Sequence, residues 1–173
     1  MMDPVIPAVA QDGSLYRIGK MQAHRSGALH LAVSVFVFDG ARMLIQRRAE
    51  TKYHCGGLWA NACCTHPHWD ESAPDAAARR LREELGCSVP LQARGETLYR
   101  ADVGAGLWEH ERVTLFRGEA PRETLTFDLD PAEVSAVRWA GIDDLRAEME
   151  GDPAAFAPWF RIYLDRWETL GIA

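Results

Sequence analysis

The sequence predicts an α/β or α+β sandwich, in which helices pack against a β-sheet. Three observations support this class: an apolar, β-rich run early in the chain, a charged helical segment after it, and helical segments near the C-terminal end. The chain has 173 residues, which is enough to enclose one sizeable core, so we expect a single domain over residues 1–173.

The expected sheet begins with a hairpin. Residues 31–38 are apolar and rich in β-branched and aromatic side chains, Asp39 and Gly40 form a turn signal, and residues 43–45 supply a second strand. Residues 55–72 then combine Gly, Cys, Trp, His and Pro, a composition typical of a functional loop.

A helix should follow this loop from about Pro74 to Leu85. Ser72 or Asp75 can cap its N-terminus, and Gly86 can end it. The later elements are expected as strands over 98–103, 108–116 and 134–139 and as helices over 142–150 and 153–170. The order of strands, helix, strands and helices places the chain in the α/β or α+β class.

Composition narrows the classes of function. Hydrophobic residues make up 47% of the chain and charged residues 25%, and no apolar run approaches the ~20 residues that span a bilayer. The N-terminus lacks the pattern of a secretory signal, and the net charge of -6 argues against broad binding to nucleic acid or membrane surfaces. Two of the four cysteines are adjacent, which is a poor disulfide pattern, so we expect a reduced, cytoplasmic protein.

The expected helix is densely charged between residues 79 and 84. Arg80 and Glu84 are four residues apart and share a face. Taken alone, such a cluster is usually a solvated surface with ion pairs. Cys64 and His66 lie just before the helix, however, so a thiol, an imidazole and a phosphate-binding face would share one loop–helix unit.

Histidines and glutamates form a candidate metal site. His24 and His30 precede the first core strand, His66 lies in the loop, and Glu109 and Glu111 are two apart on an expected strand and so share a face. Each residue alone is more often ordinary, but three imidazoles and two carboxylates together suit Mg²⁺, Mn²⁺ or Zn²⁺. The histidines for which we expect ordinary surface or core roles are His54, His68 and His110, the last pointing away from the two glutamates.

Basic residues gather at one end of the second expected strand. Arg47 and Arg48 point to opposite faces, so at most one can reach a pocket, and Lys52 and Lys20 are further candidates for binding an anion. Edge-strand solubility explains these residues equally well. The aromatic candidates, for which core packing is the default and cation–π stabilisation the alternative, are Trp59, Trp69, Tyr99, Trp108 and Trp159.

The segment from Thr65 to Cys87 resembles the Nudix box. That motif reads Gly, five residues, Glu, seven residues, then Arg-Glu-aliphatic-any-Glu-Glu-any-Gly-aliphatic. Thr65 replaces the leading Gly, and Arg80 replaces the Glu after the Arg, which removes a carboxylate and adds a group able to clamp a phosphate. The positions that agree are held by Glu71, Arg79, Glu83, Glu84 and Gly86.

From Lys20 to Trp159 the chain resembles the type I isopentenyl-diphosphate isomerases, a branch of the Nudix superfamily. The family's Asn-x-x-Cys-x-His-Pro block stands at 61–67, its Arg-Arg-x-x-x-Lys segment at 47–52, and its Tyr-Arg block with the following Glu-x-Glu at 99–100 and 109–111. Its C-terminal aromatic stands as Ala157-Pro158-Trp159. His24 and His30 are six positions apart, where the family usually has seven.

The resemblance implies a fold and a set of roles. The fold is a Nudix-type α/β/α sandwich with a mixed sheet, and the proton-transferring residues are Cys64, Glu111 and Tyr99. The metal ligands, for Mn²⁺, Mg²⁺ or Zn²⁺, are His24, His30, His66, Glu109 and Glu111, and Glu84 holds an Mg²⁺ that arrives with the diphosphate. Substrate contacts come from Lys20, Arg48, Lys52, Arg80 and Trp159.

The implied reaction is the reversible isomerisation of isopentenyl diphosphate to dimethylallyl diphosphate, an early step of isoprenoid biosynthesis. A proton is added and another removed, through a tertiary carbocation. The only expected partner is the small prenyl diphosphate, and the protein is expected to be a monomer or weak homodimer. Two alternatives remain open from the residues alone. One is a Nudix pyrophosphohydrolase, against which Arg80 and the thiol argue, and the other is a metal-stabilised binding or regulatory domain.

Overall fold

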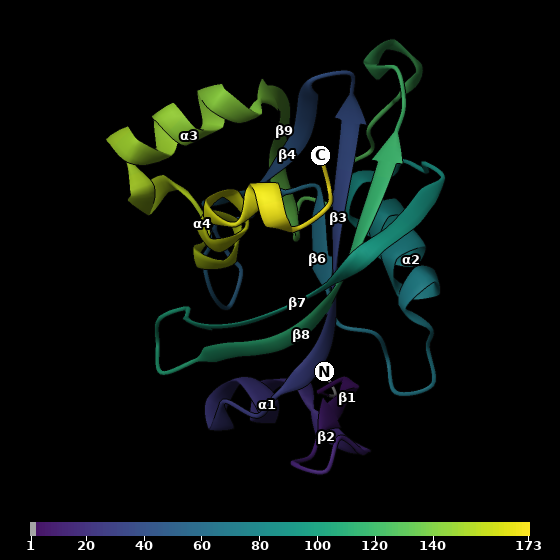
Figure 1. The fold of residues 1–173 in the computed structure, drawn as a ribbon, viewed down its shortest axis with the longest axis vertical. Coiled ribbons are helices and arrows are strands. Elements are labelled where there is room, and N and C mark those ends of the chain that lie inside the picture. Colours follow the sequence, from purple (N-terminus) through teal and green to yellow (C-terminus); the bar gives the residue numbers. More distant parts are fainter. Residues whose placement is uncertain (1–2) are drawn as a thin grey trace.

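The computed structural model describes residues 3–173 and has a nine-stranded mixed sheet with helices on both faces (Figure 1). Helix α2 (Ala73–Leu85) covers one face, and α3 (Ile142–Gly151) and α4 (Pro158–Asp165) cover the other. The expected α/β/α sandwich is therefore confirmed.

Strand β3 (His30–Asp39) lies at the centre of the sheet. It pairs in parallel with β8 (Trp108–Glu119), antiparallel with β6 (Cys63–Thr65), and at its end with β4 (Arg42–Arg48), which confirms the hairpin expected at Asp39-Gly40. The remaining strands of the core extend from these: β5 (Trp59–Asn61) and β9 (Val134–Gly141) pair with β4, and β7 (Leu91–Asp102) pairs with β8.

The side chains of β3 alternate between two hydrophobic cores, as a strand with both faces covered requires. Val33, Val35 and Val37 belong to the core under α2. Phe36 and Phe38 belong to the core under α3 and α4. Both cores are therefore anchored on one strand.

Helix α2 has the boundaries that its sequence signals predict. The Ser72 hydroxyl accepts a hydrogen bond from the Asp75 amide at 3.2 Å, and Gly86 ends the helix with φ of 67°. That left-handed conformation favours glycine. A Cβ at Gly86 would also lie 2.6 Å from the carbonyl oxygen of Asp128, so no larger residue fits without a backbone shift.

The single helix expected over 153–170 is wrong. The structure has a 3-10 turn at Pro153–Ala155, the separate helix α4, and a second 3-10 turn at Trp167–Thr169. Proline lacks an amide hydrogen and clashes with the preceding turn, so Pro158 can only begin a helix. The loop expected over 55–72 is also partly wrong, because it contains β5 and β6.

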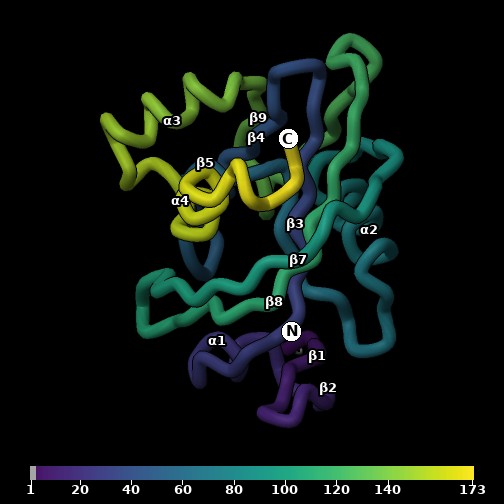
Figure 2. Tube along the Cα trace, in the orientation of Figure 1, coloured from purple at the N-terminus to yellow at the C-terminus, as the bar shows by residue number. Residues whose placement is uncertain are grey.

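An N-terminal unit of two strands and a helix was not expected from the sequence. It comprises β1 (Val5–Val9), β2 (Leu15–Gly19) and α1 (Lys20–Ser26), and it lies at one end of the molecule beside β7 and β8 (Figure 2). The unit has a small core of its own, made by Ile6, Ala8, Ile18 and Ala23. It joins the main sheet where Ala8 pairs with His30.

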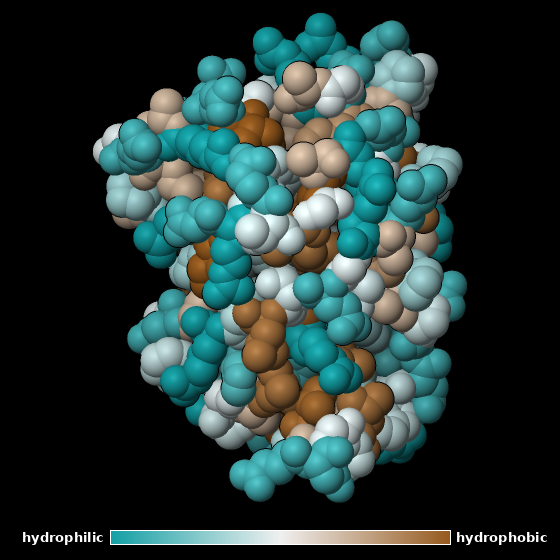
Figure 3. All heavy atoms as spheres, in the orientation of Figure 1, coloured by the Kyte–Doolittle hydropathy of each residue, from teal (hydrophilic) through white to brown (hydrophobic). Residues whose placement is uncertain are grey.

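The surface drawn in Figure 3 is mostly hydrophilic, with hydrophobic side chains gathered in bands between the polar ones. Among residues 3–173, no helix has the length and apolar character needed to cross a membrane. The four cysteines are free thiols, as expected.

Candidate active site

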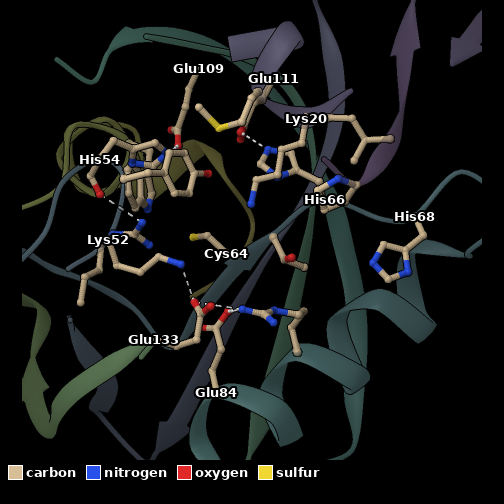
Figure 4. A pocket seen from close by; sticks show the side chains of 18 of the residues that line it. Lys20, Lys52, His54, Cys64, His66, His68, Glu84, Glu109, Glu111 and Glu133 are labelled. Atoms are coloured by element: carbon tan, nitrogen blue, oxygen red, sulfur yellow. Dashed lines mark hydrogen bonds and ion pairs between the residues drawn. The ribbon is translucent and has the colours of Figure 1, made fainter. Parts of the chain in front are cut away.

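A cavity of about 410 Å³ collects most of the residues singled out from the sequence. In Figure 4, Glu109 and Glu111 lie on one side of it, Glu84 and Glu133 on the other, and Cys64 between them. The expected site residues that line the cavity are Lys20, Arg48, Lys52, Cys64, His66, Arg80, Glu84, Tyr99, Glu109, Glu111 and Trp159. His24 and His30 do not line it, but both are fully buried beside it.

Four buried residues converge at the wall formed by α1, β3, β6 and β8. His24, His30, His66 and Glu111 each offer one ligand atom, and these atoms lie within 4.8 Å of one another. His66 Nε2 is 2.8 Å from Glu111 Oε1 and 3.2 Å from His30 Nε2. Gly27, with φ of 66°, ends α1 and turns the chain, so the six-position spacing still brings the rings of His24 and His30 to 5.0 Å.

The hydrogen bonds of two of these histidines fix their tautomers. Nδ1 of His24 donates to the Lys20 carbonyl and Nδ1 of His30 to the Ala28 carbonyl, each at 2.7 Å. When the rings are neutral, their Nε2 atoms therefore carry lone pairs, and Nε2 of His24 has no hydrogen-bond partner among the described residues. Buried lone pairs that face a carboxylate and another imidazole fit a divalent cation, so the residues present suit the metal that the sequence implies.

The two carboxylates of β8 share one hydroxyl. Tyr99, opposite Glu111 in the β7–β8 register, places its hydroxyl 2.9 Å from Glu109 Oε2 and 2.7 Å from Glu111 Oε2. Burial and the charge of Glu111 raise the pKa of Glu109 well above its usual range, whereas contacts with His30 and His66 outweigh burial and hold the pKa of Glu111 low. His110 points away and faces the Gly27 carbonyl, as expected.

Cys64 is held in a polar network on the cavity side of β6. Its thiol donates to Asn61 Oδ1 at 3.0 Å and lies 3.3 Å from the Ser34 hydroxyl, which in turn lies 2.8 Å from the Tyr163 hydroxyl. Burial raises the pKa of Cys64 to about 12, so at neutral pH it is a protonated thiol. Cys63 points to the other face of the sheet, into the core under α2.

Two basic residues at the cavity, Lys52 and Arg80, are already paired with carboxylates. Lys52 Nζ lies 2.7 Å from Glu133, and Arg80 pairs with Glu84 at 2.7 Å and with Glu133 at 3.1 Å. Glu84 also accepts a hydrogen bond from the Gln46 amide at 2.8 Å. Both oxygens of Glu84 are thus engaged by side chains of the protein.

Lys20 and Arg48 differ from this pattern. Burial, followed by repulsion from Lys52 and Arg80, lowers the pKa of Lys20 to about 8. The Arg48 guanidinium lies 5.3 Å from the ring centre of Trp159, which is 1% exposed. Arg47 points outward to Glu50, so only one of the two adjacent arginines reaches the cavity, as expected.

Sequence reasoning missed several residues of this site. Glu133, Gln46 and Tyr163 contact predicted site residues from distant parts of the chain, and no local motif marks them. His54 was expected to be ordinary, but it is buried, lines the cavity and lies 3.4 Å from Glu109. The only signal for His54 in the sequence is its position two residues after Lys52, in the loop between β4 and β5.

Residues 28–160 match the model of the NUDIX domain, and the chain belongs to this family. Solved structures agree in fold: DR0079 from Deinococcus radiodurans has a TM-score of 0.75 at 13% identity, with 94% of this chain and 98% of that chain covered. A MutT NUDIX hydrolase from Burkholderia pseudomallei has a TM-score of 0.61 at 20% identity, with 79% and 96% covered.

Much more similar relatives share a single name, Isopentenyl-diphosphate Delta-isomerase. The relative from Dinoroseobacter shibae is 52% identical over 94% of this chain and 92% of its own length. The relative from Rhodobacter capsulatus is 48% identical over 98% of this chain and 96% of its own length. The resemblance drawn from the motifs is thus confirmed at the level of the family.

Proposed function

We propose that this protein isomerises isopentenyl diphosphate to dimethylallyl diphosphate by adding one proton and removing another. The observation that carries this proposal is the placement of Cys64 and of the Tyr99–Glu111 pair in one cavity whose other wall is basic. The names of the similar proteins support the same activity.

The proton-active groups suit an alkene, which is a weak base. The thiol of Cys64 carries its proton at neutral pH, because burial raises its pKa. Glu111 is held ionised and can accept a proton, with Tyr99 donating to one of its oxygens. A proton donor and a proton acceptor on different walls of one cavity can move a double bond by one carbon, and their roles exchange when the reaction runs backwards.

The diphosphate would anchor the substrate without taking part in the proton transfers. Lys20, Lys52 and Arg80 lie where they can bind its oxygens, with Arg48 nearer the hydrocarbon. Trp159 would cover the hydrocarbon and offer a π-face to positive charge on the tertiary carbon. Binding energy from the diphosphate can thereby hold the alkene between the two proton-active groups.

We further propose that His24, His30, His66, Glu109 and Glu111 hold a divalent ion, Mn²⁺, Mg²⁺ or Zn²⁺. A bound ion would supply positive charge beside Glu111 and so control its proton affinity. Glu84 would meet an Mg²⁺ that enters with the diphosphate, after exchanging its contact with Arg80. We expect one domain that acts in the cytoplasm as a monomer or weak homodimer.

The test is an assay of metal-supplemented protein with isopentenyl diphosphate in deuterated water, followed by NMR. Cys64→Ala is compared with Cys63→Ala, the same change at a neighbouring thiol that faces the core. We expect deuterated dimethylallyl diphosphate from wild type and Cys63→Ala, and none from Cys64→Ala.

Other outcomes lead to different conclusions. Release of inorganic phosphate or pyrophosphate would identify a hydrolase, the alternative that the NUDIX relatives of known structure suggest. Equal turnover by Cys64→Ala and Cys63→Ala would show that Cys64 takes no part in the proton transfers. Absence of any product from folded, metal-loaded protein would refute the isomerase proposal.

A further inference from the structure

His54 is a buried histidine whose ring nitrogens have no hydrogen-bond partner. The residue is 6% exposed and lies in the loop between β4 and β5, outside the motifs that mark the site. Neither Nδ1 nor Nε2 forms a hydrogen bond within the part of the chain that the structure describes. Figure 4 shows His54 at the edge of the cavity, on the same side as Glu109.

Packing accounts for the faces of the ring but not for its nitrogens. Tyr53 contacts the ring at a centroid distance of 4.2 Å and Trp159 at 5.9 Å. Phenylalanine would fill such a space without burying polar atoms, whereas an imidazole without partners is costly to bury. The nitrogens must therefore have a use that the protein chain alone does not supply.

The surroundings of His54 point to a cation as the missing partner. One ligand atom each from His24, His54 and Glu109 lie within 4.8 Å of one another. His54 Nε2 lies 3.4 Å from Glu109 Oε1, with no hydrogen bond between them, and its ring stacks on that of His24 at 5.7 Å. An imidazole lone pair, a carboxylate and a second imidazole are again donors that suit a divalent metal.

This second group cannot hold an ion independently of the first. His24 belongs to both groups, and its Nδ1 is occupied as a donor to the Lys20 carbonyl. Only Nε2 of His24 is free to bind a metal, and its single lone pair can bind one ion at a time. If both groups bind metal, they must therefore share a single cation.

We infer that His54 is an additional ligand of the metal ion held by His24, His30, His66, Glu109 and Glu111. This inference rests on the metal site of the proposed function, but not on the isomerase reaction. The protein would supply four imidazoles and two carboxylates, so the ion would be enclosed by side chains and would act on the substrate only through its ligands. Four imidazoles also favour Zn²⁺, Mn²⁺ or Co²⁺ over Mg²⁺, which prefers oxygen ligands and water.

The test measures metal binding without substrate, with Co²⁺ as the probe. Metal-free protein is titrated with Co²⁺, and affinity and the visible absorption spectrum are recorded for wild type, His54→Phe, His68→Phe and His30→Ala. His54→Phe keeps the contacts with Tyr53 and Trp159 but removes the nitrogens. His68→Phe makes the same change at a histidine whose side chain is 58% exposed.

We expect His54→Phe to weaken Co²⁺ binding at least about tenfold and to change the spectrum, since even residues that only orient metal ligands contribute that much. His68→Phe should match wild type. The inference is overturned if His30→Ala loses binding while His54→Phe keeps wild-type affinity and spectrum. If His30→Ala also binds normally, the metal site itself is wrong.

Wild-type protein provides a second measurement that needs no variant at His54. X-ray absorption of the Co²⁺-loaded protein counts the imidazoles bound to the ion. Four imidazoles support the inference even if His54→Phe fails to fold, and three overturn it.

Discussion

Removing the charge of Glu71 should destabilise the protein and loosen the loop that carries His66. Glu71 accepts hydrogen bonds from Arg79 Nε at 2.6 Å, from Arg79 Nη2 at 2.8 Å and from the His68 amide at 3.0 Å. The carboxylate thus fastens residues 66–71 to helix α2. Glu71→Gln keeps the size of the side chain but loses the charge and one acceptor.

The magnitude follows from the geometry and exposure of this pair. Hydrogen bonds to charged groups contribute about 1.5–3 kcal/mol each, and exposed ion pairs about 0–1 kcal/mol. The side chains of Glu71 and Arg79 are 15% and 22% exposed, so the pair lies between these limits. We expect Glu71→Gln to lower the free energy of unfolding by about 2 kcal/mol and the Tm by about 4–8 °C.

The effect should depend on pH in a defined direction. The hydrogen bonds and charge of Arg79 lower the pKa of Glu71 below its ordinary value of 4.5. A carboxylate whose pKa is lower in the folded state stabilises that state at pH values above its unfolded-state pKa. This contribution is lost as the pH falls through the folded-state pKa. The difference between wild type and Glu71→Gln should therefore be constant near neutrality and shrink below pH 4.5.

Urea unfolding of wild type, Glu71→Gln, Arg79→Met and the double variant measures this coupling directly. A coupling energy near zero, or a stability difference that does not change with pH, would refute the reasoning. Loss of stability with unchanged Co²⁺ affinity would show that the loop keeps His66 in place without this pair.

Three further predictions concern binding and stability. Because burial lowers the pKa of Lys20 to about 8, the KM for the diphosphate should rise as the pH passes above 8. Lys20→Arg should flatten this dependence of KM on pH, and parallel profiles for the two proteins would contradict a role for the ammonium. Gly86→Ala should cost at least about 1–2 kcal/mol in urea unfolding from the left-handed backbone alone, plus the clash with Asp128, and a neutral result would contradict the observed helix end. Chelation should lower the Tm and added Zn²⁺ or Mn²⁺ should restore it, since bound metal stabilises only the folded state; identical melting of both forms would argue against a bound ion.

The sequence predicts those elements whose signals are local. The Ser72 cap and Gly86 end set the bounds of α2, and the alternating pattern of β8 places Glu109 and Glu111 on one face. Strand β1 escapes prediction because Pro7 interrupts its pattern, although its partner β2 is the next strand along the chain. The helix predicted over 153–170 is wrong because Pro158, which lacks an amide hydrogen, begins a separate helix there.

The site shows the same division between local and distant information. Cys64 and His66 lie in one short motif and are found from it, whereas Glu133 reaches Lys52 across 81 positions of sequence. His54 lies close to Lys52 but in a loop, where no periodicity tells a side chain that faces the cavity from one that faces solvent. The role proposed for it depends on Glu109 and His24, and only the folded chain brings these three together.

The separate small core of the N-terminal unit has a consequence for how the protein opens. Lys20 and His24 belong to this unit and precede residues 28–160, which match the NUDIX domain, while His30, His66 and Glu111 belong to the main sheet. An ion bound to both parts would link them, because detaching the N-terminal unit from the main sheet would break the bond between the ion and His24. Proteolytic cleavage within residues 4–27 would then report on ion occupancy. Bound ion lowers the population of the form in which the N-terminal unit is detached, and the rate of cleavage should fall by the same factor.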